Sequence, residues 1–312
     1  MCVFAAARAE PLPALGAEPG RLTVSGLSSG AYMAVQVHVA HSSRVSGAAA
    51  VAGGPYYCAQ ASVWAAYYNC MTPGAWTPLP SLAALRTGVD ALAKAGRIDA
   101  ASHVAGSRVW LFSGSEDRTV TRPVVDALQQ FYASLKANTV LVGDRAAGHA
   151  MVTESSGNAC GVTEPPYIND CDYDAAGELL AHLLGPLAPA STAQGRLLRF
   201  DQRPFAKDAW MADEGFVYVP KSCESSQCRI HVAFHGCRQA GEPFPRDAGY
   251  NRWAESNRLI VLYPQVAPSW NWQAFNPRGC WDWWGYTGSE YHTRNGPQVR
   301  AVISMVDRLA AR

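Results

Sequence analysis

The sequence has few charged residues and no excess of either sign. Asp, Glu, Lys and Arg make up 16% of its 312 residues, and 26 basic against 25 acidic side chains leave a formal net charge of +1. A protein that binds nucleic acid through its overall charge carries a clustered excess of Lys and Arg, so this balance excludes that class. Disorder is excluded as well, because 48% of the residues are hydrophobic and the net charge is low.

The sequence also lacks long apolar runs. None reaches the roughly 18 residues that a membrane span requires, so no partnership with a membrane is expected. The first residues are apolar and end in Ala7-Arg8-Ala9, which is typical of a signal-peptide cleavage site, although the charged segment that opens such a peptide is missing. We therefore expect residues 1–9 to be the remnant of a signal peptide and the domain proper to comprise residues 10–312.

The cysteines lack the spacing of a metal site. No Cys-x-x-Cys pair and no His at zinc-ligand spacing accompanies them, so no metal is expected. Eight remain when Cys2 is set aside, an even number that favours four disulfides and a secreted or periplasmic location. Eight cysteines allow on the order of a hundred connectivities, so proximity along the chain is only a weak guide to which cysteines pair. The close couples are Cys58 and Cys70, Cys160 and Cys171, and Cys223 and Cys228, with Cys237 and Cys280 further apart.

Short apolar strands alternate with helices in the first part of the chain. The expected strands are residues 21–26, 47–52, 108–112 and 139–142, and the expected helices are residues 31–41, 80–105, 123–135 and 174–184. This alternation predicts parallel β-α units in an α/β fold.

A linker rich in Pro, Ala and Gly follows at residues 185–195, and the pattern then changes. Residues 197–200 and 215–219 are expected to form an antiparallel edge of the sheet. Two further strands, residues 229–234 and 259–263, flank a helix at residues 250–256. An amphipathic helix at residues 298–311 closes the chain.

The clearest chemical motif is Gly26-Leu27-Ser28-Ser29-Gly30, between the first strand and the first helix. A serine nucleophile sits on a tight strand-to-helix turn, and the flanking glycines remove side chains that would clash there. The N-terminus of the helix then directs backbone N–H groups toward the oxyanion. We expect Ser28 to be a nucleophile.

Partners for such a serine follow later strands, in the order acid and then histidine. Asp117 follows the strand at residues 108–112, and His149 follows the strand at residues 139–142. His149 would accept the Ser28 proton, and Asp117 would orient the imidazole. Glu116 is the main alternative candidate for the acid of the triad, and Asp144 is a poorer candidate than Glu116.

His235-Gly236-Cys237 follows the strand at residues 229–234. A turn of this type supplies the second oxyanion N–H in α/β hydrolases. The expected oxyanion hole therefore consists of the backbone N–H groups of Ser29 and Cys237, with the His235 side chain supporting the loop.

The order of these motifs indicates a circular permutation. An α/β hydrolase normally runs from the oxyanion strand to the nucleophile strand, whereas here the nucleophile comes first. Joining residue 312 to residue 20 and cutting at residues 185–195 would restore the ordinary order, and permutation is tolerated where the termini lie close together. We expect a circularly permuted α/β-hydrolase fold, built as a single domain around a mostly parallel central sheet.

Several motifs together resemble the catalytic domain of extracellular short-chain-length polyhydroxyalkanoate depolymerases of the permuted type. The matching segments, over nearly the whole mature chain, are residues 26–33, 52–58, 166–171, 234–237 with Gln239, 262–265 and 276–285. The resemblance implies a serine esterase that cuts 3-hydroxybutyrate polyesters or their oligomers, with Ser28, Asp117 and His149 as its triad. It implies no metal or nucleotide cofactor.

Aromatic residues near the expected site are candidates for holding this substrate. Trp270 and Trp272 lie in the same short stretch as three further tryptophans. Such density is often core packing, but the loop context and the low charge favour an ester-binding surface. The residues expected to contact substrate are Tyr32, His235, Arg238, Trp281, Trp283 and Trp284.

Three other functions stay open. A poly(aspartic acid) hydrolase would use the same triad and line its cleft with cations, for which Arg118, Arg122, Arg145, Arg238 and Arg278 are available near the site residues. A feruloyl or acetylxylan esterase is a second alternative. A binding protein that kept the fold without catalysis is a third, and the intact set of catalytic residues argues against it.

Overall fold

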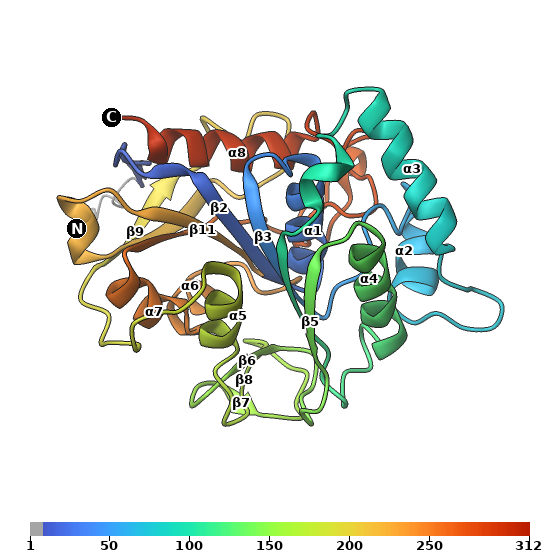
Figure 1. The fold of residues 1–312 in the computed structure, drawn as a ribbon, viewed down its shortest axis with the longest axis horizontal. Helices are drawn as coiled ribbons and strands as arrows, with labels where there is room; N and C mark the ends of the chain where they lie inside the picture. The colour runs from blue at the N-terminus through green and yellow to red at the C-terminus, as the bar shows by residue number, and fades with distance from the viewer. Residues whose placement is uncertain (1–8) are drawn as a thin grey trace, which may run out of the picture.

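The computed structural model describes residues 9–312 (Figure 1). Nine of the strands form one mostly parallel sheet. The signal-peptide remnant expected at residues 1–9 lies, apart from Ala9, outside the described residues. The nine strands follow the order β1-β9-β10-β12-β11-β2-β3-β4-β5. Across residues 9–312, no helix combines the length and apolar character that a membrane span requires.

Six neighbouring strands of this sheet are parallel, and an antiparallel pair extends it. The parallel strands are β12 (Leu259–Tyr263), β11 (Arg229–Phe234), β2 (Glu18–Leu27), β3 (Val45–Val51), β4 (Arg108–Phe112) and β5 (Asn138–Val142). β10 (Glu214–Val219) pairs antiparallel with both β12 and β9 (Arg196–Asp201), and β1 (Glu10–Pro11) lies parallel to β9. The antiparallel edge predicted from the sequence is therefore confirmed.

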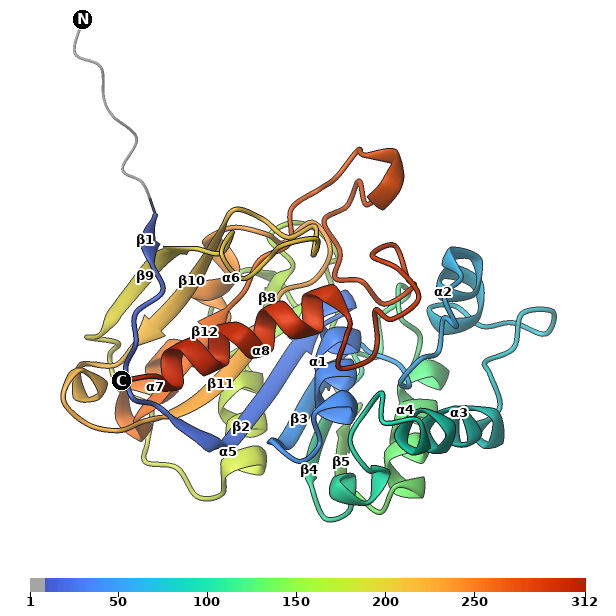
Figure 2. The same ribbon diagram turned by 90° about the horizontal axis from the view of Figure 1, so that it is seen from above.

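Helices cover both faces of the sheet, as Figures 1 and 2 show. α1 (Ser29–Ala40) and α8 (Pro297–Ala310) pack on one face, and α5 (Ala175–Leu184) and α7 (Tyr250–Asn257) pack on the other. Every residue of α1 is buried, which explains why its sequence carries no polar face. The helix that follows the nucleophile motif is thus fixed on all sides by the core.

The remaining helices lie at the periphery. α4 (Arg122–Ser134) packs beside β5 and contacts α1 through the pair His38 and Tyr132, and α3 (Leu82–Lys94) packs on α4. α6 (Pro243–Asp247) precedes α7. The sequence analysis missed α2 (Val63–Cys70), because its large apolar residues Val63, Trp64, Tyr67 and Tyr68 are exposed and give no pattern of burial.

The strand order confirms the circular permutation. Counted from β9, the first long strand after the linker, and continued from α8 into β2, the sheet reads 1-2-4-3-5-6-7-8, the order of an α/β hydrolase. The segment that leads into β2 lies beside the C-terminal residues (Figure 2), since Gly16 N–H donates to Ala311 O over 2.8 Å, and both Leu15 and Ala17 donate to Leu309 O. A short connection would therefore place α8 directly before the nucleophile strand.

A buried polar cluster fixes β2 against β11 below the nucleophile turn. The two ring nitrogens of His231 lie 2.8 Å from Thr23 Oγ1 and 2.7 Å from Ser25 Oγ, and Ser25 also bonds Tyr250 Oη over 2.7 Å. Complete burial lowers the pKa of His231 to about 3, so its ring is neutral. The cluster holds the strand that leads into Ser28 without placing a charge in the core.

All eight cysteines that remain when Cys2 is set aside form disulfides. The bonds join Cys58 to Cys70, Cys160 to Cys171, Cys223 to Cys228 and Cys237 to Cys280. The prediction of four disulfides is confirmed, and proximity along the chain gives the correct partners.

Candidate active site

Ser28 stands on a strained turn between β2 and α1. Its backbone has φ 56° and ψ −121°, a conformation that costs energy for a residue with a side chain and that clusters at functional sites. A Cβ on Gly26 would lie 2.3 Å from the carbonyl carbon of Gly30, and a Cβ on Gly30 would lie 2.4 Å from the carbonyl oxygens of Phe234 and His235. Only glycines therefore allow this turn to close and the start of α1 to approach the end of β11.

Asp117 and His149 meet beyond the ends of β4 and β5. His149 Nδ1 lies 2.7 Å from Asp117 Oδ2, and both side chains are buried. The other carboxylate oxygen of Asp117 accepts hydrogen bonds from the N–H groups of Thr119 and Val120 at 2.8 and 3.0 Å. Because these bonds fix the carboxylate, it can hold the imidazole with Nδ1 protonated and Nε2 free.

The two competing acids lie apart from His149. Glu116 faces Arg118 at 3.9 Å, and Asp144 faces Arg145 at 3.7 Å, with both acids well exposed. Within the described part of the chain neither acid makes a hydrogen bond or ion pair with the imidazole, so Asp117 is the acid that the structure brings to it.

The loop that carries His149 is itself anchored. The backbone N–H of His149 donates to Thr163 Oγ1 at 2.9 Å, and the N–H of Gly148 donates to Cys160 O at 2.8 Å. The segment around Cys160 is in turn closed by its disulfide to Cys171 and by a small sheet of β6 (Met151–Thr153), β7 (Asn158–Ala159) and β8 (Ile168–Asp170). This insertion fixes the imidazole in place.

Ser28 and His149 line one cavity of about 260 Å³. No partner contacts His149 Nε2 among residues 9–312, so this nitrogen is free to take a proton. The remaining lining residues are Leu27, Met71, Thr119, Thr163, Tyr167, Gly236, Cys237, Arg238 and Arg278. Met71 and Thr163 follow no recognisable motif and were not predicted to lie here, and Tyr167 was not predicted as a site residue although it belongs to the matching segment at residues 166–171.

One of the two expected oxyanion donors lines this cavity, and the other directly follows Ser28. Ser29 is the first residue of α1, and Cys237 lines the cavity directly. Among the described residues neither backbone N–H has an acceptor, whereas the N–H of Gly236 is occupied by Gln239 Oε1 at 2.7 Å. The arrangement leaves the Ser29 and Cys237 donors available to a bound oxygen.

Three residues expected at the substrate are buried, which corrects the picture of an open aromatic surface. Tyr32 is 3% exposed and stacks on Trp283, with its hydroxyl donating to Cys70 O. His235 is fully buried, because one ring nitrogen bonds Gly236 O and the other accepts from Val266 N–H. These two rings support the walls of the site rather than face a ligand.

Trp281 is fully buried as well, edge-on to Phe234 and tilted against His235. Within the described chain its indole N–H has no hydrogen-bond partner. It packs below the loop His235-Gly236-Cys237, because the segment that follows Cys280 enters the core.

Of the other three expected residues, Arg238 is exposed and Trp284 is partly exposed, whereas Trp283 is buried, at 6% exposure, and reaches only the wall of a cavity. Arg238 lines the Ser28 cavity, and Trp283 and Trp284 line an adjoining apolar cavity of about 220 Å³. The two cavities share Met71, Cys237 and Arg278. An apolar chain can therefore extend from Ser28 into a second, apolar compartment.

A buried carboxylate that the sequence analysis missed organises this second compartment. Asp282 accepts hydrogen bonds from the N–H groups of Trp284, Gly285, Tyr286 and Thr287, and from the Thr287 hydroxyl, at distances of 2.6 to 3.2 Å. Burial raises the pKa of Asp282, while these hydrogen bonds oppose the shift.

Asp282→Asn is expected to destabilise the protein. The amide can accept through one oxygen, but its NH₂ group would meet the N–H donors on the other side. Leaving a buried donor unpaired costs about 1–3 kcal/mol, so the free energy of unfolding is expected to fall by at least that amount in guanidinium titrations. Asp90→Asn, at an exposed surface ion pair, serves as the control and is expected to change it by less than about 0.5 kcal/mol. Equal stability of the two variants would contradict this role.

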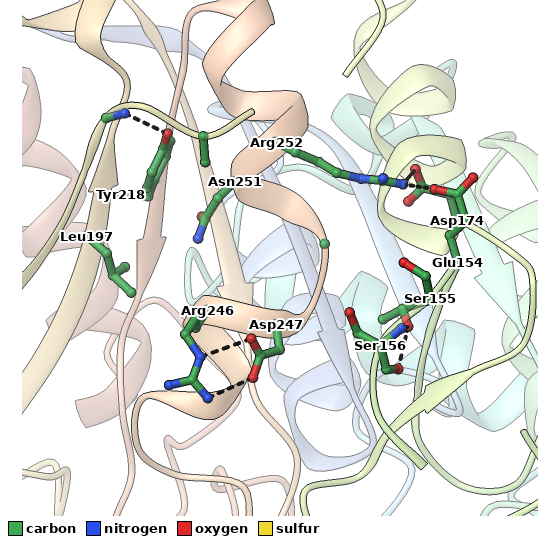
Figure 3. A pocket seen from close by; sticks show the side chains of 14 residues that line it. Glu154, Ser155, Ser156, Asp174, Leu197, Tyr218, Arg246, Asp247, Asn251 and Arg252 are labelled. Carbon is green, nitrogen blue, oxygen red and sulfur yellow. Dashed lines mark hydrogen bonds and ion pairs between the residues drawn. The ribbon is translucent and has the colours of Figure 1, made fainter. Parts of the chain in front are cut away.

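A separate cavity of about 420 Å³ shares no residue with the Ser28 cavity (Figure 3). Figure 3 shows Arg252 directed at Asp174 and Glu154, and Arg246 paired with Asp247. Its cations are therefore already neutralised by neighbouring acids. Among residues 9–312, no group of three or more His, Cys, Asp and Glu side chains could hold a metal ion.

No family model matches the chain, but its relatives among known proteins share one activity in their names. A poly(3-hydroxybutyrate) depolymerase of Delftia acidovorans is 42% identical over 96% of this chain, which spans 62% of that relative's length. A polyhydroxybutyrate depolymerase of Talaromyces funiculosus is 34% identical over 97% of this chain and 93% of its own.

Solved structures agree with these relatives. A PHB depolymerase from Penicillium funiculosum superimposes with a TM-score of 0.87 at 31% identity, over 97% of this chain and 100% of the other. A serine-to-alanine PHB depolymerase complexed with an R3HB trimer gives the same TM-score at 32% identity, with the same coverage. Sequence and fold therefore agree over almost the entire chain, which belongs to the family of the polyhydroxybutyrate depolymerases.

Proposed function

We propose that this protein is a serine esterase that depolymerises poly(3-hydroxybutyrate)-type polyesters or their oligomers. The observation that carries the proposal is the Asp117–His149 hydrogen bond beside Ser28 in one cavity. The names of the relatives support the substrate, and the match in fold to a PHB depolymerase complexed with an R3HB trimer supports the same overall chemistry.

In the proposed reaction the substrate ester is cleaved through an acyl-enzyme. Ser28 Oγ attacks the ester carbonyl while His149 Nε2 takes its proton, and the tetrahedral oxyanion is stabilised by the N–H groups of Ser29 and Cys237. His149 then gives the proton to the departing alkoxide oxygen. Water, activated by the same imidazole, hydrolyses the acyl-Ser28 ester and returns the serine hydroxyl.

The surface around the second cavity suits an uncharged polyester. Val63, Tyr67 and Phe275 line its mouth and are exposed, and Trp270 and Trp272 on the adjacent loop are 75% and 86% exposed. Contiguous exposed apolar side chains mark binding surfaces more often than ordinary solvent-facing surface. We infer that this surface contacts the polymer.

The four disulfides support a secreted or periplasmic location, because such bonds persist in oxidising compartments. Among the described residues, these disulfides are the only feature that supports the export expected from the signal-peptide remnant.

The substrate is tested by incubating the protein with poly(3-hydroxybutyrate) film, soluble R3HB oligomers, polyaspartate and a feruloyl ester, and identifying the products. We expect 3-hydroxybutyrate and short oligomers from the first two substrates and no release from the others. Ser28→Ala is the matched control for contaminating hydrolases. Cleavage of polyaspartate alone would overturn the proposed substrate and favour the alternative that the arginines near the site first suggested.

A further inference from the structure

Two arginines at the mouth of the Ser28 cavity have no partner. Arg238 and Arg278 both line this cavity, and across residues 9–312 neither guanidinium makes a hydrogen bond or ion pair. No Asp or Glu lines the cavity either. Its lining therefore carries positive charge that no acid of the protein neutralises.

The two arginines are held together by their backbones. Arg238 N–H donates to Arg278 O over 2.7 Å, and the adjoining Cys237 is bonded to Cys280. Arg238 also has φ 61°, a left-handed conformation that is unfavourable for a residue with a Cβ. The structure thus keeps both arginines together in the lining of the cavity, at some conformational cost.

The arginines of the polar cavity in Figure 3 are bound differently. Arg252 and Arg246 in the polar cavity of Figure 3 are paired with acids of the protein itself. A guanidinium is a fork of donors that matches a carboxylate in two parallel hydrogen bonds. Arg238 and Arg278 offer this geometry to a ligand instead.

We propose that Arg238 and Arg278 bind the free terminal carboxylate of a polyester chain or oligomer. This inference rests on the proposed function. In a polyester of a hydroxy acid, the acyl group bound by Ser28 belongs to the segment with the free hydroxyl end. The leaving alcohol belongs to the segment with the free carboxyl end, so a carboxylate held at this rim places the scissile ester near that end.

The consequence is a preference for chain ends and for acid-terminated oligomers. The two arginines act on the leaving segment and take no part in the proton transfers at Ser28 and His149. Their removal is therefore expected to reduce the hydrolysis of acid-terminated oligomers more than the hydrolysis of uncharged esters.

The test compares an R3HB trimer as free acid with its methyl ester at the carboxyl end. In the wild type we expect kcat/KM to be about tenfold higher for the free acid, in line with a charge-assisted hydrogen bond, and the preference to fall with added salt. Arg238→Gln with Arg278→Gln is expected to abolish the preference, so that the loss of kcat/KM on the free acid exceeds any loss on the methyl ester about tenfold. Arg300→Gln with Arg312→Gln removes two positive charges from exposed arginines outside the cavity lining and is the control, which is expected to keep the wild-type preference.

Each outcome decides between the claims. Equal hydrolysis of both trimers by the wild type overturns the carboxylate inference and leaves the proposed function intact. An equal loss on both trimers in the double variant also overturns it, since the arginines would then support the fold of the loops. Hydrolysis of neither trimer by the wild type overturns the proposed function and this inference with it.

Discussion

Replacing Ser28 by Ala is expected to reduce kcat on a soluble R3HB oligomer by a factor on the order of 10⁴ to 10⁶. The variant removes the proposed nucleophilic hydroxyl, while the other residues that line the cavity, including the oxyanion donor Cys237, stay in place. The free energy of unfolding is expected to change little, because the Ser28 hydroxyl makes no hydrogen bond within residues 9–312.

The control for this substitution is Ser289→Ala, which makes the same change at an exposed position. It is expected to retain the activity and the thermal unfolding temperature of the wild type. Hydrolysis by Ser28→Ala at more than about one-hundredth of the wild-type kcat would reject Ser28 as the nucleophile.

Asp117→Asn is expected to give the second large effect, a loss of kcat on the order of 10⁴. An asparagine amide presents either an oxygen or an NH₂ group to His149 Nδ1, and the Thr119 and Val120 N–H groups compete for its single oxygen. The NH₂ group would then face the imidazole and favour the tautomer with Nε2 protonated, which cannot accept the Ser28 proton. The loss is expected mainly in kcat, with KM little changed, in steady-state kinetics on a soluble oligomer.

Glu116→Gln is the matched control, because Glu116 is the adjacent acid in the same loop and faces Arg118 at the surface. It is expected to change kcat by less than about twofold, as surface substitutions usually have small effects. If the two variants lost the same activity, the loop as a whole would be important and Asp117 would have no special part.

The backbone of the site could be predicted from the sequence because it follows from local rules. Gly26 and Gly30 are required by a turn that leaves no room for a Cβ, and Asp117 and His149 follow parallel strands whose carboxyl ends meet at one edge of the sheet. The permutation was predictable for the same reason, since motif order along the chain is visible without a structure.

The direction in which each ring points could not be predicted. Tyr32, His235 and Trp281 lie next to catalytic motifs, yet all three face the core, because neighbouring residues along an irregular loop do not alternate with a fixed period. Asp282 gave no sequence signal either, since its partners are backbone N–H groups of the residues that follow it. Long-range packing decides these orientations, and single-sequence patterns do not contain it.

The central claim is that Ser28 is activated by His149 as a nucleophile. The most direct test is to react the native protein with a fluorophosphonate and locate the adduct by peptide mass spectrometry. We expect one adduct per chain, on the peptide that contains Ser28, and no adduct on Ser28→Ala. Ester hydrolysis is expected to be lost in proportion to the labelling. A stoichiometric adduct on another residue, or full hydrolysis after Ser28 is labelled, would contradict it.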